Sequence, residues 1–267
     1  MIIRTVEAVV LGAVEGLTEF LPVSSTGHLI LTAHVLGLHS EAVKTFTVVI
    51  QAGAMGAVAW LYRPHLAAVC RGAVGRDPAG RRLGWNLLVS FFPAALVGLW
   101  LHEPIKRLLF GVGPVATALV VGGVAMIALD RRSRQPGGRG VDALTAREAL
   151  LIGLAQCLAL WPGMSRAMVT IVGGLLVGLS PVAATEYSFL LALPTLGAAT
   201  LFDAAIGGDG LMAEAGATAI AAGFAVTGVT AALAMRGFLG YVSRHGLALF
   251  GWYRLALAAV VWGLLRP

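Results

Sequence analysis

The stretch "EGLTEFLPVSSTGHLI", residues 15–30, decides the fold, because it places polar groups inside a segment that is otherwise apolar. It holds two glutamates, a Ser-Ser-Thr run and a histidine around a central proline. A proline inside a helix removes a backbone hydrogen bond and breaks the helix. Polar, broken backbone at membrane depth is tolerated only where protein or a cavity surrounds it. The stretch therefore predicts two half-helices that meet at a polar break inside a membrane protein.

Composition supports a membrane protein that crosses the bilayer several times. Of the 267 residues 58% are hydrophobic and only 12% are charged, and the mean hydropathy is +0.86. The formal net charge of +6 is carried by a few short segments, so it indicates orientation in the membrane rather than a surface for DNA or RNA. We expect membrane lipid around the chain and no nucleic-acid partner.

Eight apolar regions follow one another along the chain. A complete crossing needs roughly 20 mostly apolar residues. Six regions meet this requirement, at about 43–62, 84–101, 113–130, 186–202, 218–235 and 247–265. The other two, 5–36 and 148–180, are interrupted by "LPVSST" and "WPGMSR". These two match each other in one constant register, which pairs Glu15 with Gln156 and Ser24 with Ser165 and indicates a duplicated unit.

Charged segments between these regions predict the orientation. Arginines dominate 63–82 and 131–147, as expected on the cytoplasmic side, whereas 203–214 carries only acidic charges. The first broken region must then enter and leave the membrane from outside, and the second from inside. We predict an all-α polytopic membrane protein with six transmembrane helices and two re-entrant helical hairpins in an inverted-topology repeat. The expected organisation is a single membrane domain, 1–267, with repeat one at about 1–130, repeat two at about 148–267, and the basic loop 131–147 between them.

The first broken region carries groups suited to phosphate chemistry. Glu15 and Glu19 are four residues apart and share one helix face, so either one of them keeps a proton or a cation sits between them. Carboxylate oxygens favour Mg²⁺ or Ca²⁺. Ser24 and Ser25 stand where a second half-helix begins, as helix caps or as part of an anion site. His28, three residues beyond Ser25, could accept a proton from Ser25 or from water.

The second broken region repeats this arrangement in "WPGMSRAMVT", residues 161–170. Ser165 is placed to cap the new half-helix, and Arg166 projects from its first turn. An arginine at membrane depth needs an anionic partner, and phosphate suits its forked donors. Thr170 shares the face of Arg166 and can donate a further hydrogen bond. A structural ion pair between Arg166 and a glutamate is the alternative to a phosphate site.

The two motifs "EGLTEFLPVSSTGH" and "PGMSRAMVT" together closely resemble the undecaprenyl-diphosphate phosphatase family of bacteria, also called the bacitracin-resistance family. The resemblance covers nearly the whole chain, including "FTVVIQAGA", "EYSFLLALP" and the late "YR" at 253–254. It implies hydrolysis of undecaprenyl diphosphate to the monophosphate carrier of cell-wall synthesis. It also implies dependence on a divalent cation, a place in the bacterial cytoplasmic membrane, and a site open to the extracytoplasmic side.

The motif positions carry functional roles to residues of both broken regions. The expected catalytic residues are Glu19, Ser25, His28 and Arg166, the substrate-binding residues are Ser24, Ser165, Arg166 and Thr170, and the metal ligands are Glu15 and Glu19. The chain departs from the family at one place, where Ala167, Met168 and Val169 replace the usual Ser-Gly-Ala between the arginine and the threonine. This exchange removes a hydroxyl group and adds bulk beside the phosphate motif.

Two other functions stay open at this point. A transporter or flippase of a phosphorylated polyprenyl lipid would share the inverted repeat and the broken helices but would need no nucleophile. The "SSTGH" element is also similar to phosphatidic-acid-phosphatase-like enzymes, but the second histidine of that class has no counterpart here before His245. Whether Ser25 or a water attacks, and whether the protein forms a homodimer, is likewise left open by the sequence.

Overall fold

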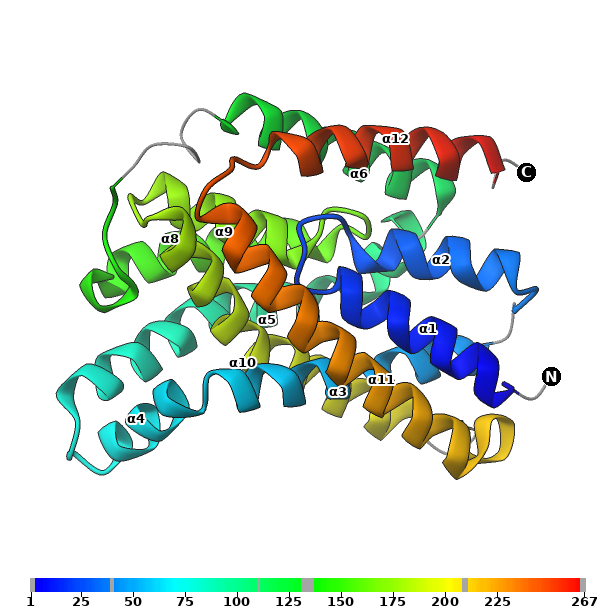
Figure 1. Ribbon diagram of the computed structural model, residues 1–267, viewed down its shortest axis with the longest axis horizontal. Helices are drawn as coiled ribbons and strands as arrows, with labels where there is room; N and C mark the ends of the chain where they lie inside the picture. Colours follow the sequence, from blue (N-terminus) through cyan, green and yellow to red (C-terminus); the bar gives the residue numbers. More distant parts are fainter. Residues whose placement is uncertain (1–2, 39–40, 110, 131–136, 208–210, 265–267) are drawn as a thin grey trace.

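The computed structural model describes residues 3–38, 41–109, 111–130, 137–207 and 211–264, and these form helices joined by short connections (Figure 1). The α-helices are α1 (Thr5–Thr18), α2 (Ser25–Val35), α3 (Glu41–Leu61), α4 (Arg63–Ala73), α5 (Pro78–Leu109), α6 (Val112–Ala128), α8 (Ala146–Gln156), α9 (Arg166–Leu176), α10 (Pro181–Gly207), α11 (Leu211–Val242) and α12 (Ala248–Leu264). Two 3₁₀ turns, η1 (Val141–Ala143) and η2 (Cys157–Leu160), flank α8. The described residues contain no strand beyond an isolated bridge between Arg139 and Leu179. The all-α prediction is confirmed.

Long apolar helices support the prediction of a membrane protein. Three helices are long and apolar enough to cross a bilayer, namely Pro78–Leu101, Pro181–Leu201 and Ala215–Val242. The number rises to five if two bent helix pairs, Thr45–Leu61 with Arg63–Ala73 and Glu103–Leu109 with Val112–Ala128, each count as one span. The last predicted crossing corresponds to α12, which has 17 residues and is shorter than a typical span. Length and composition therefore give three to five crossings in the described chain.

The arginine-rich segment 63–82 is mostly helical. Its first part forms α4, which is bent by 80° from α3. Pro64 lies in the first turn of α4, where a missing N–H costs nothing, and the alanines, leucine and arginine that follow are good helix formers. Gly72 allows α4 to touch the start of α5, because a Cβ atom there would lie 2.1 Å from the Arg81 nitrogen. Of the other basic segment, 131–147, residues 131–136 lie outside the described residues.

The two broken regions have the same local geometry. Ser24 precedes α2 and Ser165 precedes α9, with φ of 73° and 69°, and these are the only non-glycine residues with positive φ in the described ranges. Each serine side chain accepts a hydrogen bond from the backbone N–H three residues later, of Gly27 and of Met168. Both helices have 11 residues, and each begins directly after its serine. The breaks thus recur in the register seen in the sequence.

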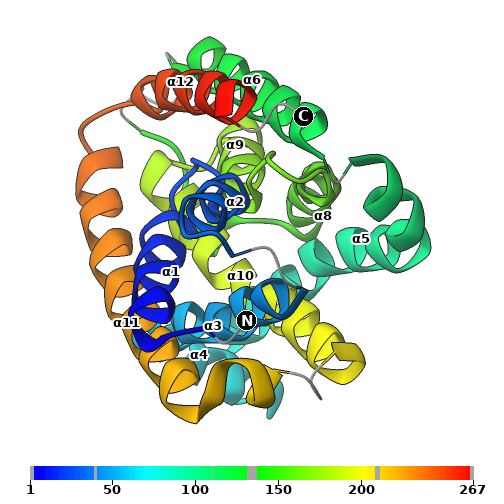
Figure 2. The same ribbon diagram turned by 90° about the vertical axis from the view of Figure 1, so that its right-hand side faces the viewer.

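The helices of the two broken regions lie toward the middle of the molecule. In Figure 2, α2, α8 and α9 are surrounded by α11 on one side, α6 and α12 above, and α5 on the other. Glycines permit the closest contacts: a Cβ atom on Gly16 of α1 would lie 2.4 Å from the Thr227 carbonyl oxygen of α11. The outer helices show large apolar side chains such as Trp100 at the surface, which suits contact with lipid. This packing brings the two breaks together.

Candidate active site

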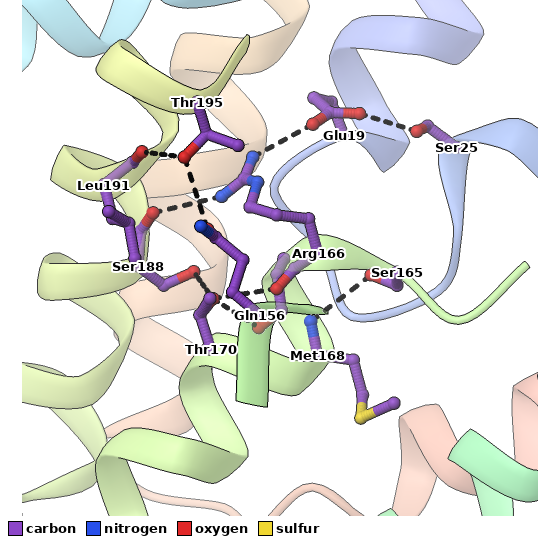
Figure 3. A network of polar contacts seen from close by, with 11 residues as sticks. Glu19, Ser25, Gln156, Ser165, Arg166, Met168, Thr170, Ser188, Leu191 and Thr195 are labelled. Atoms are coloured by element: carbon purple, nitrogen blue, oxygen red, sulfur yellow. Dashed lines mark hydrogen bonds and ion pairs between the residues drawn. The ribbon is translucent and has the colours of Figure 1, made fainter. Parts of the chain in front are cut away.

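A buried ion pair joins the two broken regions. Arg166, the first residue of α9, donates through Nη2 to the Glu19 Oε1 atom at the end of α1, over 2.9 Å (Figure 3). The two residues are 147 positions apart in sequence, and their side chains are only 8% and 6% exposed. Removal of either partner would leave an uncompensated buried charge. The structural alternative from the sequence, an Arg166–glutamate pair, is therefore present in the structure.

Ser25 contacts the other oxygen of the same carboxylate. Its hydroxyl donates to Glu19 Oε2 over 2.6 Å. Because Ser25 and Arg166 hold the two oxygens of one carboxylate, the hydroxyl and the guanidinium lie within roughly 8 Å of each other, as hydrogen-bond lengths require. A single diphosphate can reach both groups. Glu19 is also placed to accept the proton that Ser25 would lose as a nucleophile.

Further contacts orient Arg166. Its Nη1 atom donates to the Ser188 carbonyl of α10 over 3.0 Å, and its guanidinium lies 5.5 Å from the centre of the Phe20 ring. Its Nε atom is buried and makes no hydrogen bond to the described residues, so this N–H remains for a ligand. Thr170 is fully buried and bonds the Arg166 carbonyl and the Ser188 hydroxyl, over 2.8 and 2.6 Å. Thr170 therefore supports α9 against α10 behind Arg166.

His28 is not paired with Ser25 in the structure. Its Nδ1 atom lies 2.8 Å from the Ser24 carbonyl oxygen, and its Nε2 atom lies 2.7 Å from the Tyr253 hydroxyl of α12. The sequence places Ser25 and His28 on one helix face, but the Ser25 side chain turns back to the end of α1 instead. Glu19 thus occupies the place beside Ser25 that the spacing suggested for the histidine.

Glu15 is the most unusual polar group of the site. It is 1% exposed, and neither of its carboxylate oxygens makes a hydrogen bond of ordinary geometry to the described residues, although the Gln51 side chain of α3 interacts with the carboxylate. Gln156, its counterpart in the second repeat, is equally buried but bonds both Thr195 and the Ser90 carbonyl, each over 3.3 Å. A buried carboxylate with so few partners is costly unless a proton or a cation accompanies it. Glu15 is therefore compatible with either a retained proton or a bound cation.

The described residues hold no group of three or more histidine, cysteine or acidic side chains arranged for a metal. Both oxygens of Glu19 are already engaged, by Ser25 and Arg166. A cation beside Glu15 and Glu19 would thus need most of its oxygen ligands from phosphate and water, as is usual for Mg²⁺.

Ser24 and Ser165 act as helix caps. Their hydroxyl oxygens accept from the Gly27 and Met168 N–H groups, each over 3.3 Å. Ser25 and Arg166, the first residues of α2 and α9, both bond Glu19, so the amino-terminal ends of these helices lie beside the ion pair, where free N–H groups and the helix dipole favour an anion.

The unusual residues 167–169 belong to the core. Ala167, Met168 and Val169 are all buried and pack in the main hydrophobic cluster. Figure 3 shows the Met168 side chain pointing away from Glu19 and Ser25. The departure from the family motif therefore changes the packing behind the site rather than the groups that face Glu19.

Arg254 is a site residue that the sequence reasoning missed. It is completely buried, and its guanidinium donates to four backbone carbonyls, those of Pro22, Ala118, Leu119 and Gly163. Pro22 and Gly163 belong to the two breaks, so this one side chain ties both of them to α6. The rule that singled out Arg166, an arginine within an apolar helix, applies equally to α12 and would have found Arg254.

Fold and site together define a class: a helical membrane protein whose two broken helical regions bring serine, carboxylate and arginine into one buried polar site. The sequence profile of the bacitracin resistance protein BacA family matches residues 8–260. The chain belongs to this family, which confirms the family resemblance seen in the motifs.

Curated relatives cover nearly all of the chain. A protein of Sorangium cellulosum named undecaprenyl-diphosphatase is 54% identical over 259 residues, which span 96% of this chain and 84% of the relative. Undecaprenyl-diphosphatase 2 of Rhodospirillum rubrum is 47% identical, covering 97% of this chain and 94% of the relative. The undecaprenyl-diphosphatase of Nitrosospira multiformis is 46% identical, with 96% and 93% coverage.

Proposed function

We propose that this protein is an integral membrane phosphatase that hydrolyses undecaprenyl diphosphate to undecaprenyl phosphate and inorganic phosphate. The activity regenerates the lipid carrier used in cell-wall synthesis. Support comes from the family, from the names of relatives that align over nearly the whole chain, and from the long apolar helices. The observation that carries the chemistry is the single carboxylate of Glu19, which holds the Ser25 hydroxyl and the Arg166 guanidinium together.

Arg166 binds the phosphoryl oxygens and stabilises the negative charge that grows on them in the transition state. Its unpartnered Nε atom, and the amino-terminal ends of α2 and α9, supply further donors to the diphosphate.

Ser25, or a water that it positions, attacks the terminal phosphorus. The new P–O bond forms as the bond from the terminal phosphorus to the bridging oxygen breaks, and undecaprenyl phosphate leaves. Glu19 accepts the proton of the attacking hydroxyl group. If Ser25 attacks, a water then cleaves the phosphoserine and releases inorganic phosphate.

Glu15 and Glu19 would hold a divalent cation, Mg²⁺ or Ca²⁺, together with the diphosphate. A bound cation would neutralise charge on the phosphoryl oxygens and lower the cost of two neighbouring carboxylates. The support is the buried Glu15 carboxylate, for which the described residues supply no hydrogen bond of ordinary geometry and only the neutral Gln51 side chain as a neighbour that lowers its cost beside Arg166.

The membrane arrangement is six crossings with two re-entrant hairpins, α1–α2 and α8–α9, in an inverted repeat. Its support is the recurrence of the serine caps at Ser24 and Ser165 and the uneven distribution of arginines. The protein resides in the bacterial cytoplasmic membrane, with the site open to the extracytoplasmic side.

Phosphate release from purified protein tests the function. Incubation with undecaprenyl diphosphate should release inorganic phosphate in the presence of Mg²⁺ or Ca²⁺, and a chelator should suppress the release. Ser25→Ala should reduce turnover severely if the serine is the nucleophile and more mildly if it positions a water. A transporter or flippase of the same lipid would release no phosphate at all.

A further inference from the structure

We propose that Tyr253 is a positioning residue for the proposed phosphatase reaction, acting through His28. The Tyr253 hydroxyl lies 2.7 Å from His28 Nε2. The two rings are stacked, with centroids 5.6 Å apart and planes within 4° of parallel. Neither the family match nor the motifs of the two hairpins assigns a role to this side chain.

The contacts of His28 define its tautomer. The Ser24 carbonyl oxygen, 2.8 Å from Nδ1, can only accept a hydrogen bond, so Nδ1 carries a hydrogen. Nε2 of the neutral ring therefore has the free lone pair and accepts from the Tyr253 hydroxyl. Because each nitrogen has its own partner, the ring is held in one orientation.

That orientation directs Nε2 toward the Tyr253 hydroxyl. The Ser25 proton already has an acceptor in Glu19. His28 can therefore contact a phosphoryl oxygen or a water only when that group takes the place of Tyr253 at Nε2, and until then the Tyr253 hydroxyl keeps Nε2 oriented. Tyr253 is 46% exposed, so a group from outside the protein can reach its contact with His28.

Arg254 explains why Tyr253 stays in place. It follows Tyr253 in α12 and is fixed by carbonyls from both hairpin breaks and from α6. This anchor sets the position of α12 against the first hairpin. Because Arg254 is fixed in this way, the adjacent Tyr253 is held with its hydroxyl against the His28 ring.

Kinetics of Tyr253→Phe test the positioning role, because this substitution removes the hydroxyl but keeps the ring. We expect kcat for phosphate release to fall about 5–10-fold, the loss of one neutral hydrogen bond, with KM changed less than about twofold. Tyr241→Phe is a matched control, since Tyr241 stacks on His245, with centroids 4.6 Å apart, outside the site. Its kcat should equal that of the unmodified protein. A kcat of Tyr253→Phe that also equals it would overturn the proposal.

A double substitution tests whether Tyr253 acts through His28. If it does, His28→Ala with Tyr253→Phe should be no slower than His28→Ala alone. If the double variant instead loses kcat by the product of the two single losses, Tyr253 acts independently of His28 and the positioning role is rejected.

Histidine ¹⁵N NMR of the full protein in lipid gives a readout independent of activity. The His28 signals, identified by their loss in His28→Ala, should show a hydrogen on Nδ1, and the Nε2 signal should shift in Tyr253→Phe but not in Tyr241→Phe. A hydrogen on Nε2 in the neutral ring would contradict the inference even in a protein that releases phosphate. Conversely, the expected spectra without any phosphate release would reject the phosphatase while leaving the Tyr253–His28 contact established.

Discussion

At the scale of single residues, the site depends on how the nitrogens of one guanidinium are directed. Arg166 reaches the Glu19 carboxylate with Nη2 and the Ser188 carbonyl with Nη1, while Nε remains for a ligand. A lysine ammonium has three donors at one point and cannot span the same acceptors. The geometry therefore demands arginine rather than positive charge alone.

Arg166→Lys should lower kcat for phosphate release by at least about 10²-fold, the scale of losing one preorganised donor. The assay is phosphate release from purified protein at saturating lipid diphosphate. Arg63→Lys is the control, because Arg63 lies over the Trp60 ring away from the site and should retain its activity. If turnover of Arg166→Lys stays within about threefold of that of the unmodified protein, the directed nitrogens of the Arg166 guanidinium are not required for the reaction.

Glu19→Gln should lower turnover and also weaken the response to added Mg²⁺ or Ca²⁺, because a neutral amide is a poorer ligand. Phosphate release across a metal titration measures the response, and equilibrium dialysis with Ca²⁺ measures binding directly. Glu15→Gln is the comparison, since it leaves the Glu19–Arg166 pair intact yet should also reduce cation binding. Lower turnover with an unchanged titration would instead assign Glu19 a direct acid–base role.

At the scale of helices, α1 is positioned by close contact with α11. A Cβ atom on Gly16 would lie 2.4 Å from the Thr227 carbonyl oxygen and 2.8 Å from the Ala231 nitrogen. Both are backbone atoms, so the helices must separate to accept a side chain. Because Gly16 lies between Glu15 and Glu19 in sequence, such a separation would move both carboxylates.

Gly16→Ala should therefore destabilise the protein by about 1–3 kcal/mol, the usual cost of overpacking, and reduce phosphate release. Gly56→Ala is the matched control, because nothing lies within 4 Å of its Cβ position. Alanine is a better helix former than glycine, so Gly56→Ala in α3 should leave the free energy of unfolding unchanged or raise it by up to about 1 kcal/mol. Denaturant unfolding in detergent measures the stability of both variants. Equal stability of Gly16→Ala and Gly56→Ala would contradict the close packing of α1 on α11.

At the scale of the whole molecule, the proposed inverted arrangement is tested by topology. In a background where both native cysteines are replaced, single cysteines at positions 209 and 134, which lie outside the described residues, report on opposite sides. A membrane-impermeant maleimide should label position 209 in intact cells and position 134 only after permeabilisation. Native Cys70, exposed near the end of α4, should behave like position 134 when restored alone. Equal labelling of 209 and 134 in intact cells would refute the assignment.

Much of this architecture could be predicted from the order of residues alone. Apolar runs, the breaks at "LPVSST" and "WPGMSR" and the serine caps are local features, because helix formation and capping depend on neighbours within about four residues. The family match followed from the same two motifs. The number of complete crossings could not be predicted as reliably, because hydropathy does not reveal bends such as the 80° turn between α3 and α4.

Tertiary structure alone decided which polar groups meet. Spacing placed His28 beside Ser25, but the serine bonds Glu19, and the histidine bonds Ser24 and Tyr253. A shared helix face limits where a side chain can point without determining its rotamer or its partner from a distant helix. The contacts of Glu19 with Arg166, and of Arg254 with both breaks, join segments that are far apart in the chain. Such partners are selected by packing, since each buried charge or donor must find its acceptor in the folded molecule.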